Sequence, residues 1–202
     1  MELSEIRKLM QDHQEELILQ DGVRYASLLI PLVEKDGQLQ VLFEVRSSRI
    51  AQAGEISFPG GHLEKGESAW HSALRETCEE LLLKEEQVEI IAPLHRLADR
   101  GRIVIDSFLG ILHDYQDTFN QDEVERVFCV PLKWLLEQEA EVYTLDMIFD
   151  PAADFPYELI PGGKEYPFYP LKRIFYFYRY EDQIIWGLTG QFLHSFLKLL
   201  RS

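Results

Sequence analysis

The sequence predicts an α+β fold in a single domain. Three observations support this: two β-prone runs joined by a turn, a helical apolar pattern after a glycine pair, and further strands and helices without regular alternation. At 202 residues, with 46% hydrophobic residues, the chain is long enough to bury a sizeable core. It contains no internal repeat or linker, so we expect one domain over residues 1–202.

The N-terminal third begins with a helix signal and a hairpin signal. Residues 3–19 place apolar residues at roughly helical spacing between acidic ones, which predicts an amphipathic helix packed as an N-terminal extension. Residues 24–33 and 38–46 are β-prone runs, and the segment between them, Glu34-Lys35-Asp36-Gly37, is typical of a tight turn. These runs predict two antiparallel strands.

A strand, loop and helix are expected around the glycine pair. Residues 55–58 predict a short strand that ends at Pro59-Gly60-Gly61, and residues 68–82 have apolar residues at helical period. Residues 170–202 predict a C-terminal strand and helix extension. The other expected elements are strands over 88–97, 102–112, 124–130, 143–149, 174–180 and 184–186, and helices over 131–138 and 189–200.

The charge balance limits the classes of partner. The chain has 35 acidic and 20 basic residues, a net charge of −15, which disfavours binding to nucleic acid or to anionic membranes. A polyanionic small molecule would need a local basic patch or a bridging cation. The two cysteines, Cys78 and Cys129, form no disulfide framework or metal-ligand spacing, and no apolar run is long enough to span a bilayer. We therefore expect a cytoplasmic protein with reduced thiols.

Three glutamates share one face of the expected helix over residues 68–82. At about 100° per residue, Glu76, Glu79 and Glu80 fall within an arc of roughly 100°. Like charges on one face repel, and a hard divalent cation with oxygen ligands would compensate them. The alternative is an ordinary solvated acidic helix. The opposite arc, which we expect to dock on the sheet, contains Trp70, Ala73, Leu74, Thr77 and Leu81.

Residues next to these glutamates suggest supporting roles. Arg75 lies at the edge of the acidic arc, where it can pair with a carboxylate and orient it. Gly60 and Gly61 permit the unusual dihedrals and close backbone approach that a bound diphosphate needs, and a carbonyl there can complete a metal shell. Arg46 and Arg49 can hold phosphates, although surface pairing is the simpler role for Arg49.

The stretch Gly61, five residues, Glu67, seven residues, then Arg75-Glu76-Thr77-Cys78-Glu79-Glu80 resembles the Nudix box. The family's glycine after the paired glutamates is Leu82 here. The resemblance implies a Nudix fold, a mixed sheet sandwiched between helices, and diphosphate hydrolysis with Mg²⁺ or Mn²⁺. It further implies that Glu76, Glu79 and Glu80 bind metal or activate water, that Glu67 and Arg75 support them, and that Glu123 is a downstream ligand or a solvated loop acid.

A narrower resemblance points to the coenzyme A diphosphatase subgroup. It is carried by Arg46-Ser47-Ser48, by residues 53–61 and by Ile185-Trp186-Gly187-Leu188-Thr189. Gln52 and Asp106 depart from the subgroup, which has histidine and proline at these places. The resemblance implies hydrolysis of coenzyme A or its thioesters to 3′,5′-ADP and 4′-phosphopantetheine.

Other functions remain open at this point. The same helix would serve a hydrolase of ADP-ribose, a dinucleotide or a nucleoside triphosphate, a non-catalytic nucleotide-binding module, or a structural interaction protein. The aromatic residues within 168–180 can stack an adenine or form a homodimer surface, while core packing of a strand explains most of them. We expect a small nucleotide diphosphate as substrate and neither nucleic acid nor membrane as partner, and the aromatic surface would also allow a homodimer.

Overall fold

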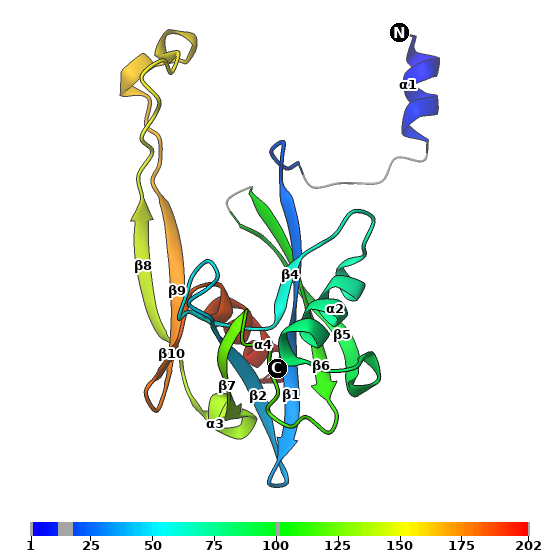
Figure 1. Ribbon diagram of the computed structural model, residues 1–202. Coiled ribbons are helices and arrows are strands. Elements are labelled where there is room, and N and C mark those ends of the chain that lie inside the picture. Colours follow the sequence, from blue (N-terminus) through cyan, green and yellow to red (C-terminus); the bar gives the residue numbers. More distant parts are fainter. Residues whose placement is uncertain (1, 12–17, 100–101, 202) are drawn as a thin grey trace.

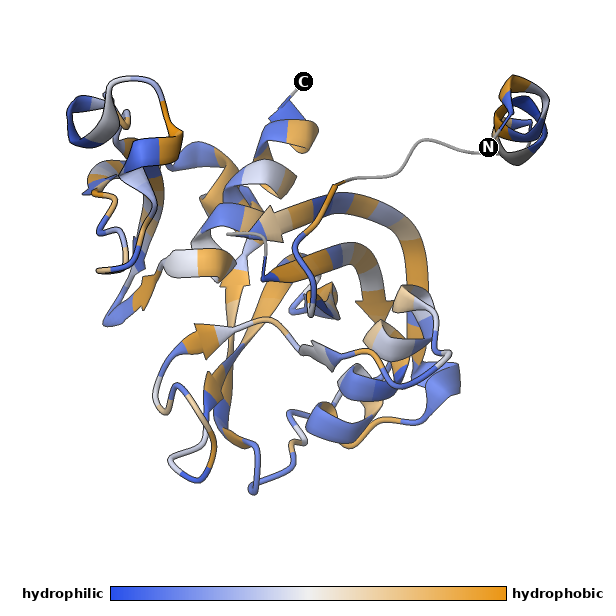
Figure 2. Ribbon diagram, turned by 90° about the horizontal axis from the view of Figure 1, so that it is seen from above, coloured by the Kyte–Doolittle hydropathy of each residue, from blue (hydrophilic) through white to orange (hydrophobic). Residues whose placement is uncertain are grey.

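The computed structural model describes residues 2–11, 18–99 and 102–201. Its first helix, α1 (Leu3–Met10), is shorter than expected, because residues 18 and 19 are not helical and residues 12–17 lie outside the described part. Leu3, Ile6 and Met10 are 64%, 43% and 54% exposed, and α1 stands apart from the other elements (Figures 1 and 2). The expected packing of this helix as an extension is therefore wrong.

The hairpin that begins the main sheet forms as the sequence predicts. Strands β1 (Arg24–Lys35) and β2 (Gln38–Arg46) pair antiparallel, and the two residues between them, Asp36 and Gly37, have φ angles of 53° and 72°. Two consecutive left-handed residues are the geometry of a tight hairpin turn, which glycine and aspartate tolerate best. This turn fixes the register, so that Lys35 lies opposite Gln38.

The main sheet has seven strands and mixed directions. Its order is β3-β2-β1-β6-β5, with β4 also pairing with β1 and β7 with β2. Strand β1 is parallel to β6, whereas the other pairs are antiparallel. The remaining strands of this sheet are β3 (Ile56–Ser57), β4 (Gly60–His62), β5 (Val88–Asp99), β6 (Ile103–Leu112) and β7 (Val124–Pro131).

Helices cover both faces of this sheet, as the sequence predicts. Helix α2 (Ala69–Leu81) packs on one face through an apolar cluster, and α3 (Leu132–Glu137) and α4 (Gly187–Arg201) pack on the other. Burying each large apolar side chain contributes about 1.5–3 kcal/mol. The first cluster includes Leu29, Val33, Leu42, Ala73, Leu74 and Leu81; the second includes Ile30, Phe43, Leu135, Phe192, Leu193 and Phe196. Figure 2 shows the apolar residues gathered along these strands.

A second, three-stranded sheet extends as a long arm beside the main sheet (Figure 1). Its order is β10-β9-β8, with β8 (Glu141–Met147), β9 (Leu171–Tyr180) and β10 (Gln183–Ile185). Strand β9 is held to α4, because His194 stacks on Tyr176 at 3.8 Å and its Nδ1 lies 3.1 Å from the Tyr178 hydroxyl. Short 3₁₀ turns complete the described chain at Glu85–Gln87, Tyr157–Leu159 and Gly163–Glu165.

None of the helices in the described ranges has the length and apolar character needed to cross a bilayer.

Candidate active site

Two glycines bring β4 against both β1 and α2. A side chain at Gly60 would place its Cβ 2.3 Å from the carbonyl oxygen of Ser27, and one at Gly61 would place it 2.4 Å from the carboxyl group of Glu76. The Gly60 N–H donates to Glu80 Oε2 at 2.8 Å. Gly60 and Gly61 belong to a short strand instead of the loop that their sequence predicts, because they pair with β1. The absence of side chains thus lets the backbone reach the acidic helix.

Helix α2 begins and ends with identifiable caps. The Ser68 hydroxyl accepts a hydrogen bond from the N–H of His71 at 3.2 Å, which satisfies one of the free donors of the first turn. At the other end Leu82 is left-handed, with φ 53° and ψ 46°, and Leu83 N–H donates to Cys78 O at 3.0 Å. Glycine is the residue most often found at a left-handed helix end. Leu82 thus has the backbone conformation that suits the glycine of the Nudix box.

Arg75 is the centre of an ion-pair network at the edge of the acidic arc. Its Nε and Nη2 donate to the two carboxylate oxygens of Glu67 at 2.9 and 3.1 Å. Its Nη1 donates to Glu76 at 2.9 Å and to Glu79 at 3.1 Å, and its Nη2 also donates to the carbonyl of His62 at 3.3 Å. The hydrogen bond from Arg75 lowers the pKa of Glu67. Arg75 therefore orients carboxylates, as its position in the sequence predicts.

Within the described ranges, Glu80 and Glu44 are buried carboxylates without an ion pair, and the charge of Arg46 only partly opposes the rise in their pKa values. Glu80 is 5% exposed and Glu44, in the middle of β2, is 1% exposed. Burial, together with Glu76 and Glu123, raises the pKa of Glu80 to about 8, although the Gly60 N–H opposes the rise. Burial and the nearby Glu80 raise the pKa of Glu44 well above its usual range. Among the described residues, Glu44 Oε1 is buried without a hydrogen-bond partner.

These carboxylates fit a hard divalent cation. An unpaired oxygen on a buried glutamate, beside two further glutamates of raised pKa, is an arrangement that a positive charge would stabilise. Within the described ranges, no three acidic, histidine or cysteine side chains already converge as a metal cluster. The hydrogen bonds explain this, because Arg75 holds Glu76 and Glu79 while the Gly60 N–H holds Glu80.

Glu123 is brought to these acids by the loop between β6 and β7. The N–H of Asn120 donates to the carbonyl of Glu80 at 2.7 Å, and Ser47 N–H donates to the carbonyl of Glu123 at 2.9 Å. The pairing of β2 with β7 shifts by one residue beside Arg46, which lies opposite Val124. The charge of Glu123 contributes to the raised pKa of Glu44, Glu76 and Glu80. The predicted downstream acid therefore lies near these carboxylates.

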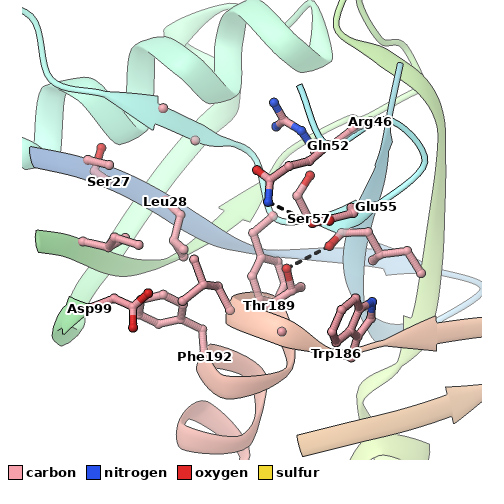
Figure 3. A pocket seen from close by; sticks show the side chains of 18 of the residues that line it. Ser27, Leu28, Arg46, Gln52, Glu55, Ser57, Asp99, Trp186, Thr189 and Phe192 are labelled. Atoms are coloured by element: carbon pink, nitrogen blue, oxygen red, sulfur yellow. Dashed lines mark hydrogen bonds between the residues drawn. The ribbon is translucent and has the colours of Figure 1, made fainter. Parts of the chain in front are cut away.

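A cleft of about 530 Å³ opens beside Gly60 and Gly61 (Figure 3). Arg46 lines it and donates from Nε to the carbonyl of Ala51 at 3.0 Å. The C-terminal segment also lines it, and the Thr189 hydroxyl donates to the carbonyl of Ile56 at 2.8 Å. Segments more than a hundred residues apart in the sequence thus form one cavity, within the usual size range for a small-molecule site.

Arg49 lies outside the cleft. It forms an exposed ion pair with Asp122, which agrees with the expected surface pairing.

Three other residues that the sequence singled out have structural roles. Burial raises the pKa of the half-buried Cys78 thiol to about 11, so Cys78 is a packed thiol. Trp70 is 42% exposed and meets the ring of His71 edge to face, so its expected place in the docked stripe is wrong. Asp106 pairs with Arg96 at 2.7 Å.

The sequence did not lead us to Glu44 or to Arg173 of the arm, which lines the cleft. Two other arm residues of the cleft were noted in the sequence, Phe175 among the aromatics that can stack an adenine and Trp186 within the segment 185–189. A signal for Glu44 was present, since a single carboxylate interrupts the apolar run Val41-Leu42-Phe43-Glu44-Val45 of an inner strand. Alternation places Glu44 on the same face as Leu42, which packs against α2. No local signal places residues of β9 beside the glycines.

The comparisons with known proteins agree with this geometry. The NUDIX domain matches residues 23–150, which is more than half of the chain, and the chain therefore belongs to the Nudix family of hydrolases. It is an enzyme of the Nudix diphosphatase class.

The chain is also similar to individual Nudix proteins. The chain is 32% identical to Nudix hydrolase 3 of Caenorhabditis elegans over 188 residues, covering 86% of this chain and 72% of that protein. It is 34% identical to the peroxisomal coenzyme A diphosphatase of Mus musculus over 146 residues, which cover 66% of this chain and 60% of that protein. The crystal structure of a MutT/nudix family protein from Enterococcus faecalis matches with a TM-score of 0.52 and 18% identity, covering 100% and 71%, which supports the fold.

Proposed function

We propose that this enzyme hydrolyses the diphosphate bond of coenzyme A or its thioesters, releasing 3′,5′-ADP and 4′-phosphopantetheine. The main observation is the cleft lined by the glycine pair and by the C-terminal segment, in which Thr189 donates a hydrogen bond of 2.8 Å to Ile56, a residue of the same 53–61 segment as the glycines. Both segments are those that resemble the coenzyme A subgroup, and a relative 34% identical is named a coenzyme A diphosphatase.

In this proposal the cation is Mg²⁺ or Mn²⁺, held by Glu76, Glu79, Glu80 and Glu123 with the carbonyl of Gly60. Their oxygens suit a hard ion, and the burial of Glu80 limits competition from water. When bound, the ion neutralises charge on the diphosphate and favours ionisation of water. If Glu76 and Glu79 turned toward the ion, they would lose their hydrogen bonds to Arg75. Arg75 would still be held in place by its two hydrogen bonds to Glu67.

The substrate side of the cleft would be formed by backbone and arginine. Gly60 and Gly61 present backbone without side chains to the cleft, which permits close approach of a diphosphate. Arg46 lines the same cleft, and its guanidinium matches phosphate oxygens. These groups would hold the diphosphate beside the acidic face of α2.

Product analysis after incubation with coenzyme A, ADP-ribose or NADH, each with Mg²⁺ and with chelator, tests the proposal. Metal-dependent release of 3′,5′-ADP from coenzyme A is the expected result. Selective cleavage of ADP-ribose or NADH would contradict coenzyme A as substrate and keep the diphosphatase class. Tight nucleotide binding without turnover at saturating metal would favour a non-catalytic binding module.

Two further predictions are independent of this reaction. A cytoplasmic location stays a prediction, and the relative from Mus musculus is named as peroxisomal. A homodimer also stays a prediction, which the mass of the purified protein in solution would test.

A further inference from the structure

A row of aromatic side chains lies on one face of the arm. Trp186, directly after β10, stacks on Phe177 with ring centroids 5.6 Å apart and an angle of 13° between the planes. Phe175 lies 6.3 Å from Trp186, and Tyr143 of β8 meets Phe177 edge to face at 5.4 Å. We call Tyr143, Phe175, Phe177 and Trp186 the aromatic platform.

The aromatic platform reaches the cleft that holds the glycine pair. Trp186 and Phe175 line this cleft together with Gly60 and Gly61. Figure 3 shows Trp186 below Ser57 and Glu55 in the view, on the side of the C-terminal segment that contains Thr189. A molecule with its diphosphate at the glycines would therefore place one of its flanking groups against Trp186.

Packing within the protein does not account for these rings as it does for others of the same strand. Tyr178 is 2% exposed, and Tyr176 stacks on His194 of α4. Trp186, in contrast, is 44% exposed although it lies on a cavity wall. A flat, partly uncovered indole supported from behind by a phenyl ring is the surface on which nucleobases stack.

A guanidinium group next to the platform provides hydrogen-bond donors for a nucleotide phosphate. The guanidinium of Arg173 lies 5.2 Å from the centre of the Phe175 ring and lines the same cleft. Arg173 also pairs with Asp99 at 3.3 Å, which fixes its side chain beside the ring. Asp99 lines the same cleft, so the pair as a whole adds no net charge, and Arg173 offers guanidinium hydrogen-bond donors to a ligand phosphate.

We propose that the aromatic platform is a subsite that stacks the purine base of the substrate, with Trp186 as its specificity-determining residue. This inference rests on the proposed function in that it needs a nucleotide diphosphate in the cleft. It assigns the adenosine half, and not the pantetheine half, to the wall formed by the arm.

Binding of the isolated halves tests the subsite without catalysis. The chain has three tryptophans, and we expect 3′,5′-ADP to quench their fluorescence while 4′-phosphopantetheine does not. Trp186→Phe should abolish the quenching, whereas Trp70→Phe, which changes an equally exposed indole outside the cleft, should retain it. Quenching by 4′-phosphopantetheine alone, or unchanged quenching in Trp186→Phe, would overturn the inference.

Steady-state kinetics with the preferred diphosphate provide the second test. Loss of base stacking in Trp186→Ala should raise KM roughly 5-fold to 150-fold and leave kcat within about 2-fold. Trp186→Phe should stay close to the unmodified enzyme, and Trp70→Ala is the matched control. Quenching by 3′,5′-ADP without cleavage of coenzyme A would contradict the proposed substrate only. Normal cleavage with an unchanged KM in Trp186→Ala would contradict the subsite only.

Discussion

The charged residues around the glycine pair form two halves that differ in how their charges are satisfied. The first half is Glu67 with Arg75, and the second half is Glu80 with Glu44 of β2. In the first half, Glu67 is held by two hydrogen bonds from Arg75, and its pKa is lowered. In the second half, Glu80 is buried beside Glu44, and both have raised pKa values. We therefore expect the first half to stabilise the fold and the second to cost stability once its carboxylates are charged. In the proposed function, a bound cation would compensate the charge of Glu80 and Glu44, and Arg75 would orient the carboxylates beside it.

The largest expected effect is on turnover when Glu80 becomes Gln. The substitution keeps the volume and removes one charge from the buried pair, so cation binding and activity should fall together. We expect kcat to drop about 100-fold or more, measured with saturating Mg²⁺. The circular dichroism spectrum should not change.

Glu86→Gln is the matched control, because it removes the same charge from an exposed position just beyond α2. It should leave kcat unchanged. Equal activity of Glu80→Gln and Glu86→Gln would remove the functional distinction between the two halves.

Arg75→Gln should have a smaller effect on activity and a clear effect on stability. It leaves Glu67 and Glu76, which are 13% and 17% exposed, without their cation. We expect a loss of about 1–3 kcal/mol in the free energy of unfolding, measured by urea titration. Arg75→Lys should recover only part of it, because an ammonium group cannot repeat the forked hydrogen bonds. Full stability of Arg75→Gln would show that the network contributes nothing.

The pH dependence of metal-free stability should have opposite signs in the two halves. The pKa of Glu80 is about 8 in the folded protein against 4.5 ordinarily, so the folded state binds the proton more tightly. Its contribution is present below pH 4.5 and is lost as the pH rises through 8. Glu67, with a lowered pKa, contributes stability above 4.5 that is lost on acidification below it.

We therefore expect Tm, measured with chelator, to fall from pH 5 to pH 8 as Glu80 ionises. Glu80→Gln should flatten that fall, and Glu86→Gln should not. Added Mg²⁺ should raise Tm most at the alkaline end, where a larger fraction of Glu80 is charged. An equally steep fall in Glu80→Gln would assign the effect to other groups.

Local signals predicted most of this motif from the sequence, and the exceptions have physical causes. The hairpin at Asp36-Gly37 and the helix after Ser68 depend on turn and capping chemistry within a few residues. The strand at Gly60 was not predicted, because glycine indicates a loop until β1 is known to lie beside it. Glu44 meets Glu80 only through the packing of α2 on the sheet.

The positions of the other cleft residues depend on contacts between segments that lie still further apart in the sequence. Trp186 was part of a recognised segment, yet its place beside the glycines follows from the packing of β9 and α4. For α1 the sequence predicted a contact that is absent, because its apolar residues are exposed. An amphipathic pattern predicts an apolar face, but it does not predict which element covers that face.

The smallest expected effect concerns the end of α2, where Leu82 occupies the left-handed position of the family's glycine. A residue with a Cβ pays a conformational cost there that glycine avoids, and Leu82 is 59% exposed, so little burial is lost on replacement. Leu82→Gly should therefore stabilise the protein by about 0.5–1 kcal/mol, or roughly 1–4 °C in Tm. Leu83→Gly, at the next and half-buried position, should destabilise it. A lower Tm for Leu82→Gly would mean that the Leu82 side chain contributes more to stability than its exposure indicates.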